Sequence, residues 1–189
     1  RTGLLLDLAR RRKDAGDADG AARALARAVC EGGDPTAVLG ELEVALPART
    51  SDGELSLLEA RAEVLSALSG VDSRGVALAW REYGAACWDL ADDPDAAMRA
   101  WQRAAALDPE RGIERLGCDL LAFGGLEVAL VRLREVARQR DEPAEQARVL
   151  AVAANLALRA DHRDEAFDIA REALELSPLQ GEVLAVAER

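Results

Sequence analysis

The residue in this sequence best suited to acid–base or metal chemistry is His162, which stands in the stretch ADHRD between two helical patterns. It is the single histidine of the chain. A general base needs partners that converge on it, and a zinc site needs several His or Cys ligands at short spacing. Neither accompanies His162, so the sequence predicts a solvated turn residue at this position.

Two acidic clusters and two glycine pairs are the other candidates for chemistry. DADG at 17–20 and DDPD at 92–95 do not continue into the twelve-residue loop of a calcium-binding EF-hand, so we expect helix-capping turns there. Gly32-Gly33 and Gly124-Gly125 lie in no phosphate-binding GxGxxG or GxxxxGK pattern and are predicted turns. With so few partners for nucleophilic catalysis, the sequence predicts no enzyme activity, no catalytic residue, no metal and no cofactor.

The three cysteines, Cys30, Cys87 and Cys118, are odd in number and far apart. No CxxC spacing supports a disulfide framework or a zinc site. We therefore expect buried, reduced thiols in a cytoplasmic protein.

Composition and charge narrow the fold class and the partners. Half of the residues are apolar but only 3% are aromatic, so the core must consist mainly of Ala, Leu and Val, which suits closely packed helices. A formal net charge of −11 argues against nucleic acid as the main partner. The longest apolar run, VLAVAANLAL at 149–158, is too short to span a membrane, so no membrane partner is expected.

One helical pattern occurs at least three times. DAAMRAWQRAAALDP at 95–109 and DEAFDIAREALELSP at 164–178 end in prolines that lie 69 residues apart, which leaves room for two units of about 34 residues. The middle unit contains Leu116-Gly117 in a first helix and Gly124-Gly125 at a turn.

The second helix of each unit carries apolar, mostly small residues at the spacing i, i+4, i+7, which lines one helical face. The three sets are Ala97, Trp101, Ala104; Ala129, Leu133, Val136; and Ala166, Ala170, Ala173. Small side chains at these positions allow two helix backbones to approach closely. A similar set, Ala60, Val64 and Ala67, follows the loop PARTSDG and a capping box at Ser51 and Glu54.

With Trp80, Tyr83, Gly84, Ala97, Trp101, Ala104 and Pro109 in one unit, the sequence resembles the tetratricopeptide-repeat (TPR) family. The first unit matches at Leu5, Leu8, Ala9, Gly16, Ala21, Leu25 and Ala28, and the last at Leu150, Ala154, Ala166, Ala170, Ala173 and Pro178. The resemblance implies an all-α fold, a right-handed α-solenoid of five antiparallel helix pairs. The expected repeats are 2–35, 36–73, 77–109, 110–143 and 147–178 in a single array over 1–189, with 179–189 as a terminal or capping helix.

Four Pro-containing dipeptides are predicted to begin helices, since Asp and Ser are good N-caps and Pro suits the first helical position. They are Asp34-Pro35, Asp93-Pro94, Asp108-Pro109 and Ser177-Pro178.

The TPR resemblance further implies a concave surface, formed by the first helices, that holds a peptide. Projected onto this sequence, the candidate peptide-binding residues are Arg81, Trp88, Arg111, Arg115, Arg148, Asn155 and Arg159. A guanidinium fork suits a carboxylate, so an acidic or C-terminal peptide is the expected ligand. Exposed arginines that only solvate the surface or pair with nearby Glu are the alternative. Chaperone-binding members of the family hold two ligand carboxylates with a clamp of Lys and Asn residues. In this sequence only Asn155 matches a position of that clamp.

Trp88 has two interpretations. Counting forward from Trp80 places Trp88 on the groove side, and counting back from Pro109 places it in the core. The core is the commoner place for Trp in a chain so poor in aromatic residues.

The leading hypothesis is a non-enzymatic, bacterial and cytoplasmic scaffold that binds a protein or extended peptide in its concave groove. Two alternatives stay open. The chain can be a regulatory TPR segment of a larger enzyme or transcription regulator, since it begins at Arg1 and ends in an incomplete repeat. It can also be a self-assembly module in which an unpaired end such as 179–189 docks on another copy.

Overall fold

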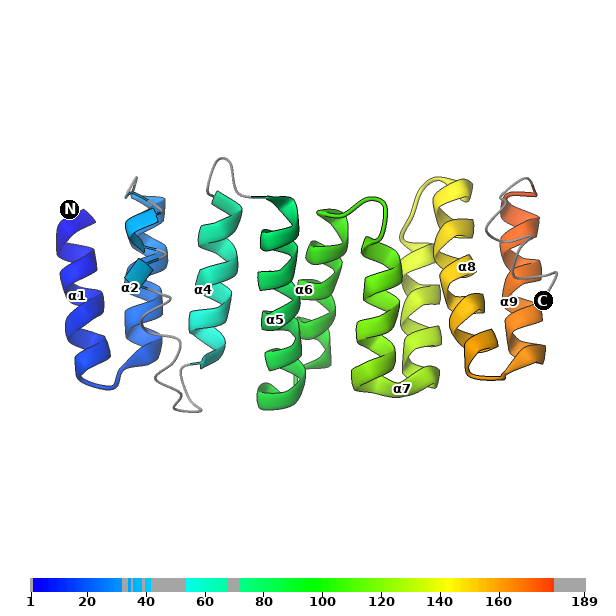
Figure 1. Ribbon diagram of the computed structural model, residues 1–189, viewed down its shortest axis with the longest axis horizontal. Helices are drawn as coiled ribbons and strands as arrows, with labels where there is room; N and C mark the ends of the chain where they lie inside the picture. Colours follow the sequence, from blue (N-terminus) through cyan, green and yellow to red (C-terminus); the bar gives the residue numbers. More distant parts are fainter. Residues whose placement is uncertain are drawn as a thin grey trace. The chain divides into compact units, whose positions relative to one another are not determined.

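A computed structural model of the chain describes residues 2–31, 34, 36–38, 40–41, 54–67 and 72–178 (Figure 1). Every regular element in these ranges is helical, which confirms the predicted all-α fold class. The helices are α1 (Thr2–Asp14), α2 (Ala18–Cys30), α4 (Glu54–Ala67), α5 (Ser73–Ala91), α6 (Pro94–Ala106), α7 (Gly112–Arg138), α8 (Pro143–Arg159) and α9 (Arg163–Leu176). Residues 36–38 and 40–41 are also helical.

The chain forms two compact units, Arg1–Pro109 and Glu110–Arg189. In the first unit α1 packs on α2, α2 on α4, α4 on α5 and α5 on α6, and in the second α7 packs on α8 and α8 on α9. Short turns join α1 to α2, α5 to α6 and α8 to α9, so these neighbours run antiparallel (Figure 1). Among the described helices, each contacts the described helix before or after it in the chain, so each unit is a TPR-like stack, the arrangement of an α-solenoid.

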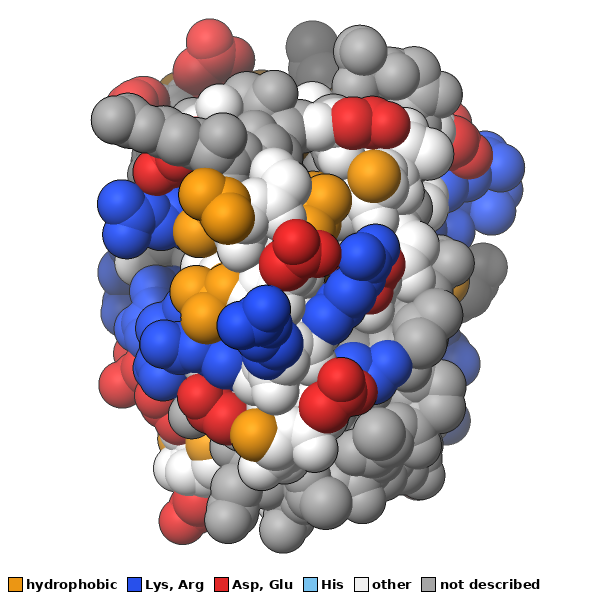
Figure 2. Space-filling model, turned by 90° about the vertical axis from the view of Figure 1, so that its left-hand side faces the viewer, with side chains coloured by type: hydrophobic (Ala, Val, Ile, Leu, Met, Phe, Trp, Pro, Cys, Tyr) orange, Lys and Arg blue, Asp and Glu red, His pale blue; other side chains and the backbone are white. Residues whose placement is uncertain are grey.

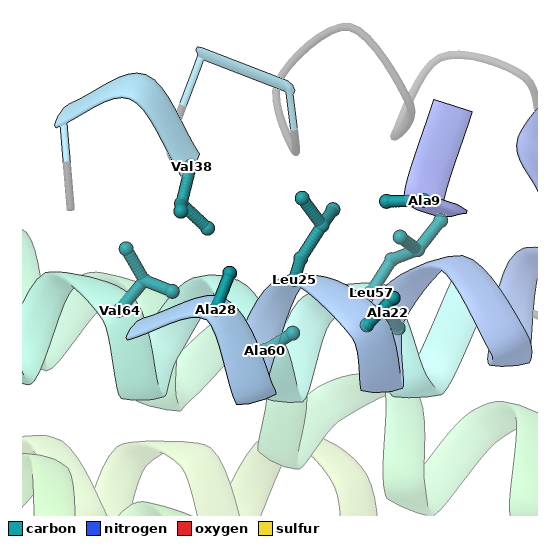
Figure 3. Close-up of a cluster of buried hydrophobic side chains, with 9 residues drawn as sticks. Ala9, Ala22, Leu25, Ala28, Val38, Leu57, Ala60 and Val64 are labelled. Carbon is teal, nitrogen blue, oxygen red and sulfur yellow. The ribbon is translucent and has the colours of Figure 1, made fainter. Parts of the chain in front are cut away.

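The core of the first three described helices is made of small aliphatic side chains (Figure 3). Leu25 of α2 and Leu57 of α4 are its larger members, and Val38 closes one side of it. The other members are Ala9, Ala22, Ala24, Ala28, Ala60 and Val64. Most of these side chains end at Cβ or Cγ, so the helix axes can approach closely. A chain with few aromatic residues can therefore still form a closely packed interior.

The predicted i, i+4, i+7 sets are buried in α6, in the second half of α7 and in α9, as expected. In α4 the prediction holds for Ala60 and Val64 and is wrong for Ala67. Ala67 is the last residue of α4, and its side chain is exposed to solvent.

The helix starts follow the predicted capping chemistry only in part. The Asp93 carboxylate accepts a hydrogen bond from the Ala96 N–H at 2.8 Å, with Pro94 at the first helical position of α6. Asp17 caps α2 by accepting from the Gly20 N–H at 2.8 Å. Both acidic clusters are therefore capping turns, as expected.

The cap predicted at Asp108-Pro109 is wrong. Three turn residues follow Asp108, and α7 begins at Gly112 with Arg111 at its N-cap position. Ser177 is the C-cap of α9, where its N–H donates to the Ala173 carbonyl oxygen. The predicted cap at Asp34 is confirmed, since its carboxylate accepts a hydrogen bond from the Thr36 N–H at 3.0 Å at the start of the helical residues 36–38. Pro35, the capping box at Ser51 and the helix over 179–189 lie outside the described residues.

The turn predicted at Gly124-Gly125 is a sharp break inside α7. Gly125 has φ 76° and ψ 179°, a conformation that residues with a Cβ rarely adopt. The break divides the 27 residues of α7 into two helical halves without an intervening loop. The first half packs against α8, as the repeat pattern requires. The second half carries the buried set Ala129, Leu133 and Val136.

We predict that Gly84→Ala destabilises the protein by about 1–3 kcal/mol, because a Cβ at this position would overlap the buried indole of Trp101. An ideal Cβ on Gly84 would lie 2.5 Å from Trp101 Cδ1 and 3.0 Å from Cε2. Urea unfolding followed by circular dichroism measures the change. Gly3→Ala is the matched control, since nothing lies within 4 Å of a Cβ there. Equal stability of the two variants would contradict the proposed close approach.

Candidate functional site

The seven predicted peptide-binding residues fall in two different units. Arg81 and Trp88 lie on α5 of the first unit. Of the other five, Arg111 and Arg115 belong to the start of α7, and Arg148, Asn155 and Arg159 to α8, all in the second unit.

Within the second unit, the first half of α7 and α8 lie side by side and run in the same direction. At the start of both helices, Arg148 Nη2 donates a hydrogen bond to the Glu110 carbonyl oxygen at 2.7 Å. Farther along, an ideal Cβ on Gly117 would lie 3.1 Å from Val152 Cγ1 and 3.0 Å from Leu156 Cδ1. The first contact joins the starts of the two helices and the second joins residues farther along both, so the helices run in the same direction. The exposed side chains of α7 after Glu110 and those of α8 from Arg148 onward therefore form two neighbouring rows.

These two rows form a surface that we name the α7/α8 strip. Its members are Arg111, Glu114, Arg115, Cys118 and Leu121 of α7 and Arg148, Val152, Asn155 and Arg159 of α8. Apart from the adjacent Glu114 and Arg115, successive members of each row are three or four residues apart, which places each row on one face of its helix. All nine side chains are exposed or partly exposed.

The strip is basic although the chain is strongly acidic. It has four arginines and one glutamate, whereas the whole chain has a net charge of −11. Arg148 keeps its guanidinium at the junction of the two helices through its bond to Glu110. Leu121 and Val152 add apolar surface beside these charges. Such a surface can bind carboxylates through charge-assisted hydrogen bonds while it holds an apolar side chain.

The sequence pattern indicated the charged members of the strip but missed Leu121 and Val152. Their helical spacing could have assigned them to the strip, because Leu121 follows Cys118 by three residues and Val152 follows Arg148 by four. Whether such a residue is exposed depends on the neighbouring helix, which the local pattern does not specify.

In the first unit, Trp88 packs against the buried Trp101. The two rings are stacked at 5.8 Å between centroids with 22° between their planes. Trp88 is partly buried, and Trp101 Nε1 donates to the Arg81 carbonyl oxygen at 3.3 Å. This stacking favours the core interpretation of Trp88 over the groove interpretation.

The Tyr83 hydroxyl and the Cys87 thiol are in contact inside the first unit. Burial raises the pKa of the Cys87 thiol, and burial also raises the pKa of the Tyr83 hydroxyl above its ordinary value. Both groups are therefore neutral at physiological pH, which suits a structural contact. The expectation of buried thiols holds for Cys87 and is wrong for Cys118, because Cys118 is on the exposed row of α7.

His162 is exposed and precedes α9, where the sequence predicted a solvated turn residue. Its Nδ1 lies 4.0 Å from a Glu165 carboxylate oxygen. Across the described ranges, no three His, Cys, Asp or Glu side chains gather closely enough to hold a metal ion. Of the helices described, none combines the length and apolarity needed to cross a membrane.

Comparisons with known proteins give similarity of fold only. No protein-family model and no curated protein matches the chain. The crystal structure of MamA is similar at 22% identity and a TM-score of 0.36, over 90% of this chain and 95% of that one. TTC0263, a thermophilic TPR protein of Thermus thermophilus, is similar at 19% identity and a TM-score of 0.35, over 100% of this chain and 98% of that one. At these values neither protein assigns a function to this chain.

We predict that Cys118 reacts with a thiol reagent about a hundredfold faster than Cys87, since Cys118 is exposed and Cys87 is buried with a raised pKa. The measurement uses two single-cysteine proteins. Cys30→Ser with Cys87→Ser retains Cys118, and Cys30→Ser with Cys118→Ser retains Cys87. Comparable rates in the folded proteins would show that the α7 row is covered, and equal rates in urea are the control for intrinsic reactivity.

Proposed function

We propose that this chain is a non-enzymatic protein-interaction module that binds an acidic, extended protein segment on the α7/α8 strip. The observation that carries the proposal is the concentration of four arginines on one exposed strip of a chain with net charge −11. A basic surface attracts acidic ligands and repels basic ones, so charge supplies selectivity.

The two parallel rows favour an extended ligand. Arg111 and Arg148 lie near one end of the strip, and Arg159 lies at the other end of its row. A segment that follows the strip can therefore bring several carboxylates to successive guanidinium groups, while an apolar ligand residue contacts Leu121. Exposed charge pairs contribute only about 0.2–1 kcal/mol each, so four of them supply at most about 4 kcal/mol and we expect affinity of about 1 mM from the charges alone.

We further propose that the helix pairs are the repeats expected from the sequence, with boundaries near 35, 73, 109, 143 and 178, and that the protein acts in the cytoplasm. The order of helix contacts within each unit supports the repeats. Arg81 remains a prediction for a second contact on α5, independent of the strip, whereas the stacking of Trp88 on Trp101 favours a structural role for Trp88.

We predict that Arg115→Glu combined with Arg148→Glu weakens binding of a fluorescent peptide of alternating Asp, Glu and Leu by at least about tenfold. The reason is that two attractive charges become repulsive. Fluorescence anisotropy at low and high salt measures the affinity, and binding by the unaltered protein is expected to fall as salt rises.

The matched control is Arg99→Glu combined with Arg138→Glu, which makes the same charge change at exposed positions on α6 and the second half of α7. This control is expected to bind almost as well as the unaltered protein. Circular dichroism checks that Arg148→Glu, which also removes the bond to Glu110, leaves the helices intact. An equal loss in both double variants would reduce the effect to net charge and sink the assignment of the strip.

Cys118 provides an independent readout, because it lies in the α7 row between Arg115 and Leu121. We predict that saturating peptide slows alkylation of Cys118 in the protein that retains only this cysteine. Binding without protection of Cys118 would place the ligand elsewhere on the molecule.

A further inference from the structure

Helix α7 folds back on itself at a single residue. Within α7, all of which the structure describes, only Gly125 departs from helical φ and ψ. An ideal Cβ on Gly117 in the first half would lie 3.6 Å from Leu133 Cδ1 in the second half, so the two halves pack against each other (Figure 1). Gly117 and Leu133 stand eight residues on either side of Gly125. This contact between the halves is therefore centred on Gly125.

The fold-back depends on the backbone of Gly125 and not on its surroundings. Its φ of 76° and ψ of 179° belong to a region that is essentially restricted to glycine. Nothing lies within 4 Å of an ideal Cβ at this position. A side chain at 125 would therefore meet no neighbour, and the only obstacle to it is the backbone conformation. In a helical conformation, by contrast, alanine is the most favourable residue.

A change to helical φ and ψ at this one residue would make α7 a single straight helix. Gly117 and Leu133 would then lie about 24 Å apart, because an α-helix rises 1.5 Å per residue. The second half of α7 would move away together with α8 and α9, since Arg134 of this half pairs with Glu165 of α9 at 3.6 Å. Leu133, which is fully buried, would be open to solvent. A straight α7 therefore needs a partner that covers this surface.

A second copy of this chain with a straight α7 provides that partner. Two such helices, antiparallel and with Gly125 opposite Gly125, place Gly117 of each copy opposite Leu133 of the other. The contacts of α8 with the first half of α7, at Gly117 and at the Glu110 carbonyl oxygen, would form again between the copies. Each contact would occur twice, so the pair is isologous and closed.

Exchange of interior surface suits this molecule better than contact between outer surfaces. On the face of the first unit that Figure 2 shows, the described hydrophobic side chains stand among Lys, Arg, Asp and Glu side chains and not in one patch. Single exposed hydrophobic side chains of this kind do not define an interface. The buried contacts of α7 already have the shape complementarity that a stable interface needs.

We propose that α7 has two states, one folded back at Gly125 within one copy, and one straight in a dimer of two copies that exchange the second half of α7 together with α8 and α9. Gly124 and Gly125 favour the folded-back state, because glycine is among the poorest helix formers. High protein concentration favours the dimer by mass action.

The exchange would also change the α7/α8 strip, and this consequence rests on the proposed function. Each strip of the dimer would combine the α7 row of one copy with the α8 row of the other, and the dimer would carry two strips. A ligand with two acidic segments would then bind the dimer more tightly than it binds one copy.

Gly125→Ala tests the two states directly, because alanine disfavours the fold-back and favours the straight helix. Analytical ultracentrifugation at about 10 µM is expected to give twice the 20.1 kDa mass of one copy, with the helical circular dichroism of the unaltered protein. A monomeric Gly125→Ala protein, or one that has lost its helicity, would overturn the proposal.

Gly16→Ala is the matched control. Gly16 also has a positive φ, 77°, with nothing within 4 Å of an ideal Cβ. It belongs to the turn 15–17 between α1 and α2, where the adjacent residues can adapt to a strained backbone. This variant is expected to remain a monomer, and a dimer of it would show that strain at any turn is enough.

The unaltered chain provides a measurement that does not depend on a variant. Refolding from urea at about 1 mM is expected to trap a dimer fraction that size-exclusion chromatography separates, whereas refolding at about 1 µM is expected to give monomer alone. Monomer alone after both would contradict the straight state.

Chemical cross-linking distinguishes helix exchange from any other association. Cys118 directly follows Gly117, where α7 contacts α8, and Asn155 is an exposed member of the α8 row beside it. In a chain with Cys30→Ser, Cys87→Ser and Asn155→Cys, a short bismaleimide is expected to join positions 118 and 155 within one copy in the monomer fraction and between copies in the dimer fraction.

A denaturing gel reads out the two cases. The dimer fraction is expected to run as a covalent dimer, and the monomer fraction at the mass of one copy. A dimer fraction that gives only single-copy bands would indicate association without exchange and overturn the proposal. None of these measurements uses the acidic peptide, so their failure is distinct from a failure of the strip to bind its ligand.

Discussion

The close approach of neighbouring helices is the constraint on which the rest of this structure depends. At Gly84 and Trp101 the approach leaves no room for a Cβ, and elsewhere buried alanines line the contacts between helices. Small residues give little apolar area each, so stability must come from many such contacts in series. The repeat pattern supplies that series, since each helix uses one face for the helix before it and another for the helix after it.

This use of two opposite faces also determines where function can lie. Helices that pack on both sides expose only a narrow row of residues, and the α7/α8 strip is two such rows brought together by Gly117. The chemistry of the strip then depends on a few side chains, because the remainder of each helix is committed to packing. Arginine suits this position, since its long stem reaches past small neighbours and its charge is retained at every physiological pH.

The sequence predicted the fold class well because its main signal is local. The spacing of Ala129, Leu133 and Val136 within one helix is enough to identify a buried face. It predicted Asp108 wrongly as a cap, because a good N-cap residue before proline does not specify whether the chain turns once more before the helix begins. It left Trp88 ambiguous, since the stacking on Trp101 depends on a contact between two helices, and it missed Leu121 for the same reason.

Packing in chain order has a consequence for how each unit forms. Each described helix of a unit contacts the described helix before or after it, and apart from the segment between α2 and α4 the connections that must close during folding are short. Chains with such low contact order fold quickly, because little chain entropy is lost before the first stabilising contact is made. A damaged helix therefore costs mainly its own two interfaces, and the remaining pairs of the same unit can stay structured while it opens.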